Sequence, residues 1–304
     1  MTTLTQSTST TQVPQARNRQ PFGRWFVEVG WRYLVALVAL VFAIFPILYV
    51  ISASLNPIGS VATTHLIPTT GVSLVHYKAL LHGDVGPFTR WYLNTLIVCA
   101  FVSIVTLVCS TLAAYAYSRM RFRGRRASLL SLMLLMMFPG FLAMIAIFTM
   151  FSDLGRIIPQ LGLSTVLGYG LALTGGALGQ VWLIKGTLDT IPQSLDEAAR
   201  IDGAGHFTIF YRIILPILRP ILATTTLLAF VGIISEFLIG SIFLRSAESK
   251  TLAVGLYGLL QGDRSGNLGV FAAGAVLTII PVVALYQYLQ RYIVGDATSG
   301  AVKG

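Results

Sequence analysis

Six long stretches that contain almost no charged residue constrain the fold more than any other feature of the sequence. A helix needs about 20 apolar residues to cross the roughly 30 Å hydrocarbon core of a bilayer. Windows of this kind lie at 33–55, 93–117, 129–151, 163–184, 221–244 and 268–289. Because backbone N–H and C=O groups find no water there, an open chain crosses only as a helix. The sequence therefore predicts an all-α integral membrane protein with six transmembrane helices.

The composition supports this reading and excludes several other classes. Charged residues make up 11% of the 304 residues and hydrophobic residues 55%, whereas a soluble domain carries about 25% charged residues. A cytosolic enzyme, a disordered chain and a small disulfide scaffold are all excluded. Pro46, Pro139 and Pro281 lie inside the windows, where we expect them to mark kinks.

The distribution of Lys and Arg predicts the orientation. Six spans place both termini on one side of the membrane, and that side receives 15 of the 21 basic residues. The other six are Lys78, Arg90, Arg156, Arg245, Lys250 and Arg264. By the positive-inside rule, both termini lie in the cytoplasm of a multi-pass protein of the cytoplasmic membrane. The net charge of +10 therefore reflects topology, and we expect no nucleic-acid partner.

This topology also predicts on which side of the membrane the segments outside the apolar windows lie. Residues 1–32 form a polar cytoplasmic leader, rich in Ser, Thr and Gln, that we expect to be disordered up to about residue 20. The apolar run at 33–55 is too long for a signal peptide and is read as a retained first span. An extracytoplasmic loop follows at 56–92. The remaining membrane domain occupies 93–289, and 290–304 is a cytoplasmic tail.

Catalytic and metal-binding motifs are missing from the sequence. There is no G-x-x-x-x-G-K-[ST] run and no H-E-x-x-H. The histidines show no spacing typical of metal ligands; they are His65, His76, His82 and His206. Cys99 and Cys109 are separated by about 15 Å of helix, too far for a disulfide. We expect no catalytic residue, metal or cofactor in this chain, which is therefore not predicted to be an enzyme.

The connection at 185–219 is the most informative cytoplasmic segment. Ser194 and Glu197 have the spacing of a capping box, in which each side chain satisfies an exposed N–H group at the helix start. Asp196 and Glu197 would also lie at the positive end of the helix dipole. Gly203 is a typical stop signal. These features predict a helix of about two turns at 195–202.

Both halves of this connection show apolar residues at helical spacing. Leu195, Ala198 and Ala199 give the first helix a small apolar face. A second helix is predicted from the apolar positions Phe207, Phe210, Tyr211 and Ile214, with Pro216 ending it. From the residues alone, two readings are equally open: a plug for a groove on a partner, or an amphipathic pair lying on the bilayer.

A family resemblance favours the first reading. Glu197-Ala198-Ala199, then Gly203, then Ile213-x-Leu215-Pro216 resembles the EAA loop of permeases from ATP-binding-cassette (ABC) importers. The resemblance implies the type I importer permease fold, with this helix as a cytoplasmic coupling helix docked on an ATP-binding subunit. The coupling residues that it implies are Ser194, Glu197, Ala198, Ala199, Asp202, Gly203 and Ala204. ATP and Mg would be held by that partner, and Glu197 either caps the helix alone or also forms a salt bridge to the partner.

Two further segments resemble the carbohydrate permeases of this family, in particular the maltose/maltodextrin type. They are residues 251–255 and the tail 290–304, and the likeness runs from the first span to the C-terminus. It implies transport of an oligosaccharide such as maltose, maltodextrin or a similar glucoside. The implied partners are a second homologous permease, a dimer of ATP-binding subunits and an extracytoplasmic sugar-binding protein, which the loop at 245–267 would contact.

The resemblance also bears on the tail, whose simplest interpretation is a frayed terminus. In the family the tail reaches between the ATPase subunits, which makes Gly300, Val302 and Lys303 candidate contacts with the ATPase.

Glu236 is the one acidic residue deep inside a predicted span. It lies about 6 Å from the centre of its window toward the outer side. A charge there costs about 2.5–3.5 kcal/mol, so the side chain should face the bundle interior or water. It is either a gate or interface residue or a protonated carboxyl that is paired for structural reasons. Candidate tyrosines for stacking on a sugar are Tyr117, Tyr169, Tyr257 and Tyr286, although aromatic belts explain most such residues.

Two other functions remain open. An ABC permease for another small solute is compatible with the EAA loop alone. A self-sufficient secondary transporter would need internal repeats and several intramembrane charges, of which the sequence shows one charge and no evident repeat.

Overall fold

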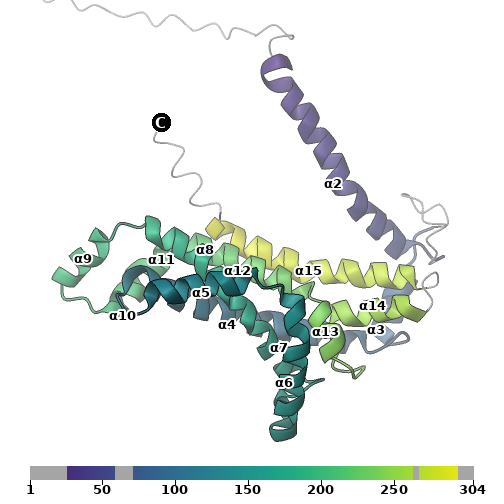
Figure 1. Ribbon diagram of the computed structural model, residues 1–304. Coiled ribbons are helices and arrows are strands. Elements are labelled where there is room, and N and C mark those ends of the chain that lie inside the picture. Colours follow the sequence, from purple (N-terminus) through teal and green to yellow (C-terminus); the bar gives the residue numbers. More distant parts are fainter. Residues whose placement is uncertain (1–25, 59–70, 263–266, 294–304) are drawn as a thin grey trace, which may run out of the picture. The chain divides into compact units, whose positions relative to one another are not determined.

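The computed structural model describes residues 26–58, 71–262 and 267–293 of the chain. These residues form helices and no strands (Figure 1). The helices are η1 (Phe26–Gly30), α2 (Trp31–Leu55), α3 (Val75–His82), α4 (Phe88–Arg119), α5 (Arg125–Met137), η3 (Gly140–Ala143), α6 (Met144–Ile157), η4 (Pro159–Leu161), α7 (Val166–Leu173), η5 (Thr174–Gly176), α8 (Ala177–Thr190), α9 (Ser194–Ile201), α10 (His206–Thr208), η6 (Ile209–Ile214), α11 (Leu215–Ile217), α12 (Arg219–Ile234), α13 (Leu238–Phe243), α14 (Leu252–Gly262) and α15 (Leu268–Ile293).

The chain divides into two compact units, Met1–Leu48 and Tyr49–Gly304. The first unit contains most of α2, a 25-residue apolar helix that continues through Pro46 without a break. Its side chains are largely exposed; Phe42, for example, is 83% exposed. Such a continuous apolar surface is stable only against lipid or another protein.

The second unit is a bundle in which α4 occupies the central position. This 32-residue helix packs against α7, α8, α12 and α14, and α12 packs in turn against α15. The helices α9 and α10 lie at one end of this unit, and α3 and α14 lie at the opposite end (Figure 1).

Three hydrophobic clusters hold the bundle together along its length. One surrounds Ile184 and Ile214 near α9. A second surrounds Tyr169 and Phe243, and a third surrounds Trp91 at the α14 end. Because α4 contributes to all three, it connects the two ends of the unit.

Within the described residues, five helices are long and apolar enough to cross a membrane. They are Phe26–Leu55, Phe88–Arg119, Gly140–Ile157, Val166–Thr190 and Leu268–Ile293. A sixth is obtained if His206–Ile217 and Arg219–Ile234, which meet at 75°, are counted as one bent span.

Two of the predicted windows are interrupted. The window at 129–151 is divided between α5 and α6, because Phe138 is extended and Pro139, which has no N–H group, precedes a short 3₁₀ turn. In contrast, α15 continues through Pro281. The window at 221–244 is divided between α12 and α13, with a break at residues 235–237.

The packing of α14 on α4 leaves no space for a side chain at Gly255. A Cβ atom there would lie 2.3 Å from Cε3 of Trp91. The indole cannot easily move away, because its Nε1 donates a 2.7 Å hydrogen bond to the carbonyl of Ala247. This glycine therefore sets how closely α14 approaches α4.

We predict that Gly255→Ala lowers the stability of the protein by about 1–3 kcal/mol, the usual cost of overpacking. The measurement is the melting temperature in detergent. Gly232→Ala in α12 is the matched control, since nothing lies within 4 Å of its added Cβ and alanine favours helix. Equal melting temperatures for the two variants would contradict the described approach of α14 to α4.

Candidate functional site

The helix predicted at 195–202 is present as α9, Ser194–Ile201, but its predicted capping box is wrong. Gln193 occupies the N-cap position with helical dihedrals of φ −68° and ψ −20°, and no side chain caps the helix start. The carbonyl of Gln193 accepts hydrogen bonds from Asp196 and Glu197. Because a capping side chain requires an extended backbone at its own residue, Ser194 lies one position too far into the helix to act as a cap.

The predicted stop at Gly203 is confirmed. Gly203 has φ +83°, a conformation that glycine adopts without a steric penalty. The N–H of Ala204 donates to the carbonyl of Ala199 at 2.9 Å, and the N–H of Gly203 donates to that of Arg200 at 3.0 Å. This pair of bonds is the Schellman motif, and it fixes the C-terminal end of α9.

A buried ion pair holds the first turn of α9. Nε of Arg119, the last residue of α4, lies 2.7 Å from Oδ2 of Asp196, and the two side chains are 3% and 5% exposed. Arg119 also donates a 2.8 Å hydrogen bond to the carbonyl of Ile191, just before α9. The sequence alone predicts only an interaction of Asp196 with the helix dipole, and it places Arg119 only among the basic residues that indicate membrane orientation. The available signal was an arginine at the very end of a long apolar run.

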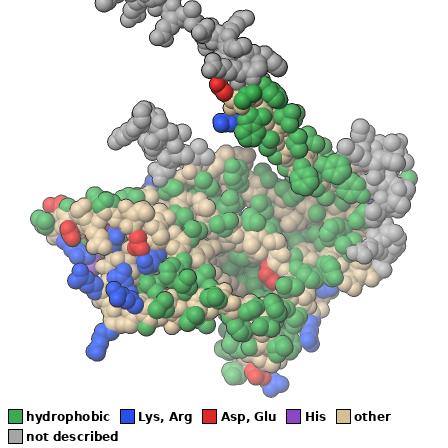
Figure 2. All heavy atoms as spheres, turned by 45° about the horizontal axis from the view of Figure 1, so that its top comes forward, with side chains coloured by type: hydrophobic (Ala, Val, Ile, Leu, Met, Phe, Trp, Pro, Cys, Tyr) green, Lys and Arg blue, Asp and Glu red, His purple; other side chains and the backbone are tan. Residues whose placement is uncertain are grey.

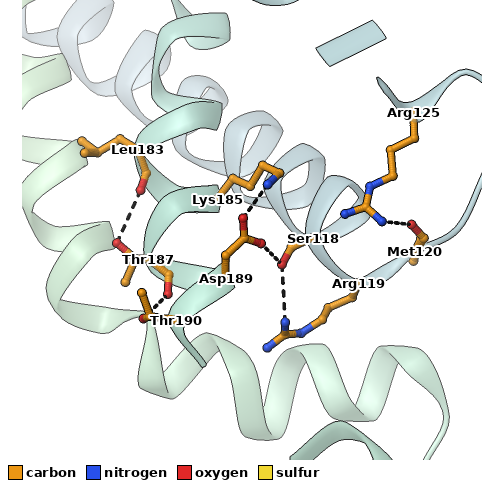
Figure 3. Close-up of polar contacts among 9 residues, drawn as sticks. All are labelled: Ser118, Arg119, Met120, Arg125, Leu183, Lys185, Thr187, Asp189 and Thr190. Carbon is orange, nitrogen blue, oxygen red and sulfur yellow. Dashed lines mark hydrogen bonds and ion pairs between the residues drawn. The ribbon is translucent and has the colours of Figure 1, made fainter. Parts of the chain in front are cut away.

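The neighbouring residue of α4 binds the preceding helix (Figure 3). The hydroxyl of Ser118 donates a 2.6 Å hydrogen bond to Asp189 of α8. Asp189 also forms a 2.5 Å ion pair with Lys185, one helical turn earlier. Two consecutive residues at the end of α4 thus bind two different elements, Ser118 to α8 and Arg119 to α9.

The outer face of α9 is open. Leu195 is 42% exposed and Ile201 is 87% exposed, while Glu197 and Ala198 between them are exposed as well. The predicted apolar face of Leu195, Ala198 and Ala199 is therefore divided, because only Ala199 turns inward to the cluster around Ile184. Of the other coupling candidates, Ser194, Asp202 and Gly203 are exposed and Ala204 is half-buried.

The second predicted helix has a different inner face from the one expected. Ile209 and Ile214 are fully buried, whereas Phe207 and Tyr211 are exposed and stacked on each other. The cause is a π-helical segment, η6, in which residues five apart share a face. Pro216 does not end this helix, since it lies at the first turn of α11, where no N–H bond is required.

Basic side chains gather over the end of the unit that carries α9 and α10 (Figure 2). The exposed members include Arg121, Arg123, Arg126, Arg200 and Arg212. A concentration of Lys and Arg is typical of the cytoplasmic face of a membrane protein.

Glu236 lies in the break between α12 and α13 and is paired there. Its carboxylate accepts hydrogen bonds from the N–H groups of Ile239 at 2.7 Å and Gly240 at 3.1 Å. The hydroxyl of Tyr169 also donates to it. The side chain therefore caps α13, which accounts for the interruption of the predicted span.

The remaining candidates are dispersed. Tyr169 is 1% exposed and thus offers no open ring face. Tyr257 packs against Phe237, Tyr117 packs against Phe122, and Tyr286 is 45% exposed. The tail candidates Gly300, Val302 and Lys303 lie outside the described residues, as do residues 1–25 of the leader, 59–70 of the outer loop and 263–266 of the loop before α15.

Comparisons with known proteins give matches to membrane components of transport systems. The family described as "Binding-protein-dependent transport system inner membrane component" matches residues 89–297. The galactooligosaccharides transport system permease protein GanQ of Bacillus subtilis is 37% identical over 283 residues, covering 92% of this chain and 98% of that protein. The maltose/maltodextrin transport system permease protein MalG of Yersinia pestis is 38% identical over 297 residues, covering 94% and 96%.

A solved structure is similar as well. The crystal structure of a bacterial ABC transporter involved in the import of the acidic polysaccharide alginate has a chain that matches with a TM-score of 0.70 and 26% identity. The match covers 90% of this chain and 98% of that chain. The predicted all-α importer permease fold and the resemblance to carbohydrate permeases are thereby confirmed. On its sequence and its fold together, the chain belongs to the family of binding-protein-dependent transport system inner membrane components.

Proposed function

We propose that this chain is the permease subunit of an ABC importer that carries an oligosaccharide inward across the cytoplasmic membrane. Both termini and α9 lie on the cytoplasmic side, as the asymmetry of Lys and Arg favours. The relatives named for maltose/maltodextrin and galactooligosaccharides support a neutral oligosaccharide. Maltose, maltodextrin or a similar glucoside is the substrate that the likeness of residues 251–255 favours.

The energy for transport comes from ATP hydrolysis in a separate subunit. The partners in this proposal are a dimer of ATP-binding subunits, a second homologous permease and an extracytoplasmic sugar-binding protein. ATP and Mg are bound by the ATP-binding subunits, and this chain binds no cofactor of its own.

One observation carries the proposal: α9 combines a fixed inner side with an open outer side. Its first turn is held by the buried ion pair to Arg119 and its last turn by the Schellman motif at Gly203. Its outer side presents Leu195, Glu197 and Ile201 to solvent. Ile201 is 87% exposed, so a partner that buried its side chain would make the free energy of binding more favourable. We infer that an ATP-binding subunit docks on this face.

Glu236 and the tail have subordinate roles in the proposal. The break at Glu236 lets α12 and α13 move as separate segments when the permease changes from an inward-facing to an outward-facing state. The tail residues Gly300, Val302 and Lys303 reach the ATP-binding subunits.

The first test is reconstitution of the assembled complex in lipid vesicles. We expect sugar uptake that requires ATP, and faster ATP hydrolysis when the loaded binding protein is added. Uptake by this chain and its partner permease without any nucleotide-hydrolysing subunit would refute the proposal and favour a secondary transporter.

The second test concerns the exposed face of α9. We predict that Ile201→Asp reduces sugar uptake at least tenfold, because a carboxylate must be desolvated in the docked complex. Ile157→Asp is the matched control; Ile157 is 79% exposed at the end of α6, and uptake should stay within twofold of wild type. Equal uptake by both variants would show that the outer face of α9 does not dock.

The third test concerns the rigid end of α9. Proline fixes φ near −65° and removes the N–H group, so Gly203→Pro should break the Schellman motif. We expect membrane insertion to persist while ATP hydrolysis becomes uncoupled from transport. Gly205→Pro is the control, because Gly205 already has φ −73°. Normal transport by the Gly203 variant would contradict the requirement for a fixed end.

A further inference from the structure

The attachment of α9 to the bundle depends on very few side chains. Of its eight residues, only Asp196 and Ala199 are buried. Ala199 contributes a single methyl group to the hydrophobic cluster around Ile184 and Ala114, which is too little apolar surface to fix a helix in one orientation. The other contact is the ion pair with Arg119, whose guanidinium and partner carboxylate lie 2.7 Å apart and are both 5% exposed or less.

Arg119 engages α9 and the segment leading into it at the same time. Its Nε faces the carboxylate of Asp196 at 2.7 Å, and one of its terminal nitrogens donates to the carbonyl of Ile191 at 2.8 Å. The hydrogen bond holds the guanidinium on the chain just before α9, and the ion pair adds a short charge–charge contact with the first turn of α9. Together these two contacts restrain the position of α9 relative to α4. A lysine, with a single charged atom on a flexible stem, would not impose that geometry.

The far end of α4 is bound just as firmly to the segment before α14. Trp91 donates to the carbonyl of Ala247 at 2.7 Å. The amide of Asn94 donates to the carbonyls of Glu248 and Lys250 at 2.8 and 3.0 Å. The hydroxyl of Thr95 accepts the N–H of Leu252 at 2.8 Å. From Trp91 to Arg119, α4 extends about 42 Å, so a single helix joins α9 to the segment at 247–252.

We propose that Arg119 is a positioning residue for transport: through Asp196 it makes α9 move as one body with α4, so that displacement of α9 reaches the segment at 247–252. The inference rests on the proposed function, and it adds the path by which a displacement of α9 reaches residues 247–252. Coupling through α8 is the competing route, because Ser118 and Lys185 bind Asp189 on that helix. Asp189 is 44% exposed, so this contact constrains the bundle less.

The direct test measures whether α9 keeps a fixed position on α4. The chain has two cysteines; Cys109 on α4 is exposed and Cys99 is buried. Spin labels on Cys109 and on Ile201→Cys report the distance between the two helices in the purified full-length chain. We expect a narrow distance distribution in the otherwise unchanged protein and a broad one after Asp196→Asn. Asp189→Asn is the matched control and should leave the distribution narrow.

The functional readout is the ratio of sugar transported to ATP hydrolysed in the reconstituted complex. Asp196→Asn should lower that ratio at least tenfold, and Asp189→Asn should leave it within twofold of wild type. Because loss of one partner from a buried ion pair can unfold a protein, the double variant Arg119→Met with Asp196→Leu is included. Replacing both charges by apolar residues is often neutral for stability, so this variant should melt like wild type and still show the low ratio.

Three results would overturn the inference: a narrow distribution in Asp196→Asn, an unchanged ratio in that variant, or a wild-type ratio in the double variant. These results differ from failure of the proposed function. In that case Ile201→Asp would transport normally, or uptake would not require ATP.

Discussion

The polar contacts at the C-terminal end of α4 determine how α8 and α9 are arranged on the bundle. A bundle made mostly of apolar side chains packs by dispersion and shape, and neither interaction has the directionality of a hydrogen bond. Directional bonds are needed wherever an element must keep one orientation. Here Ser118 donates a hydrogen bond to Asp189 of α8. Arg119 donates one to the carbonyl of Ile191 and forms an ion pair with Asp196 of α9. Apart from these contacts, α9 itself contributes only Ala199 to the buried cluster around Ile184.

The hydrogen-bonding capacity of single residues also determines the two breaks in the membrane domain. At Pro139 the helix ends because one N–H group is missing, and the chain resumes after a 3₁₀ turn. At Glu236 the helix α12 has ended, and the Glu236 carboxylate accepts hydrogen bonds from the N–H groups of Ile239 and Gly240 in the first turn of α13. The bonds to Glu236 satisfy two N–H groups in or near the bilayer, where an unsatisfied group is costly. Short independent segments can then exist within the membrane domain.

The sequence predicted features set by composition or by one residue's backbone, and it missed features set by contacts between distant residues. Apolar windows and Gly203 are local signals, and both correspond to structure. The capping box failed because Ser194 and Glu197 have the right spacing while the helix begins one residue earlier than that box requires. The pairing of Arg119 with Asp196 joins positions 77 residues apart, and no spacing rule could indicate it. The inner face of the second helix was misassigned because a period of 3.6 residues was assumed where a π-helix occurs.

The π-helical segment η6 changes which residues of the helix His206–Ile217 share a face. A π turn holds one more residue than an α turn, and each residue advances an α-helix by about 100°. The additional residue in Ile209–Ile214 therefore rotates the rest of the helix His206–Ile217 by about that angle relative to an uninterrupted α-helix. Ile209 and Ile214, five residues apart and both fully buried, share the inner face because of this phase shift. The side chains that the chain buries just before the 75° bend are thus chosen by a six-residue segment and not by the regular period of an α-helix.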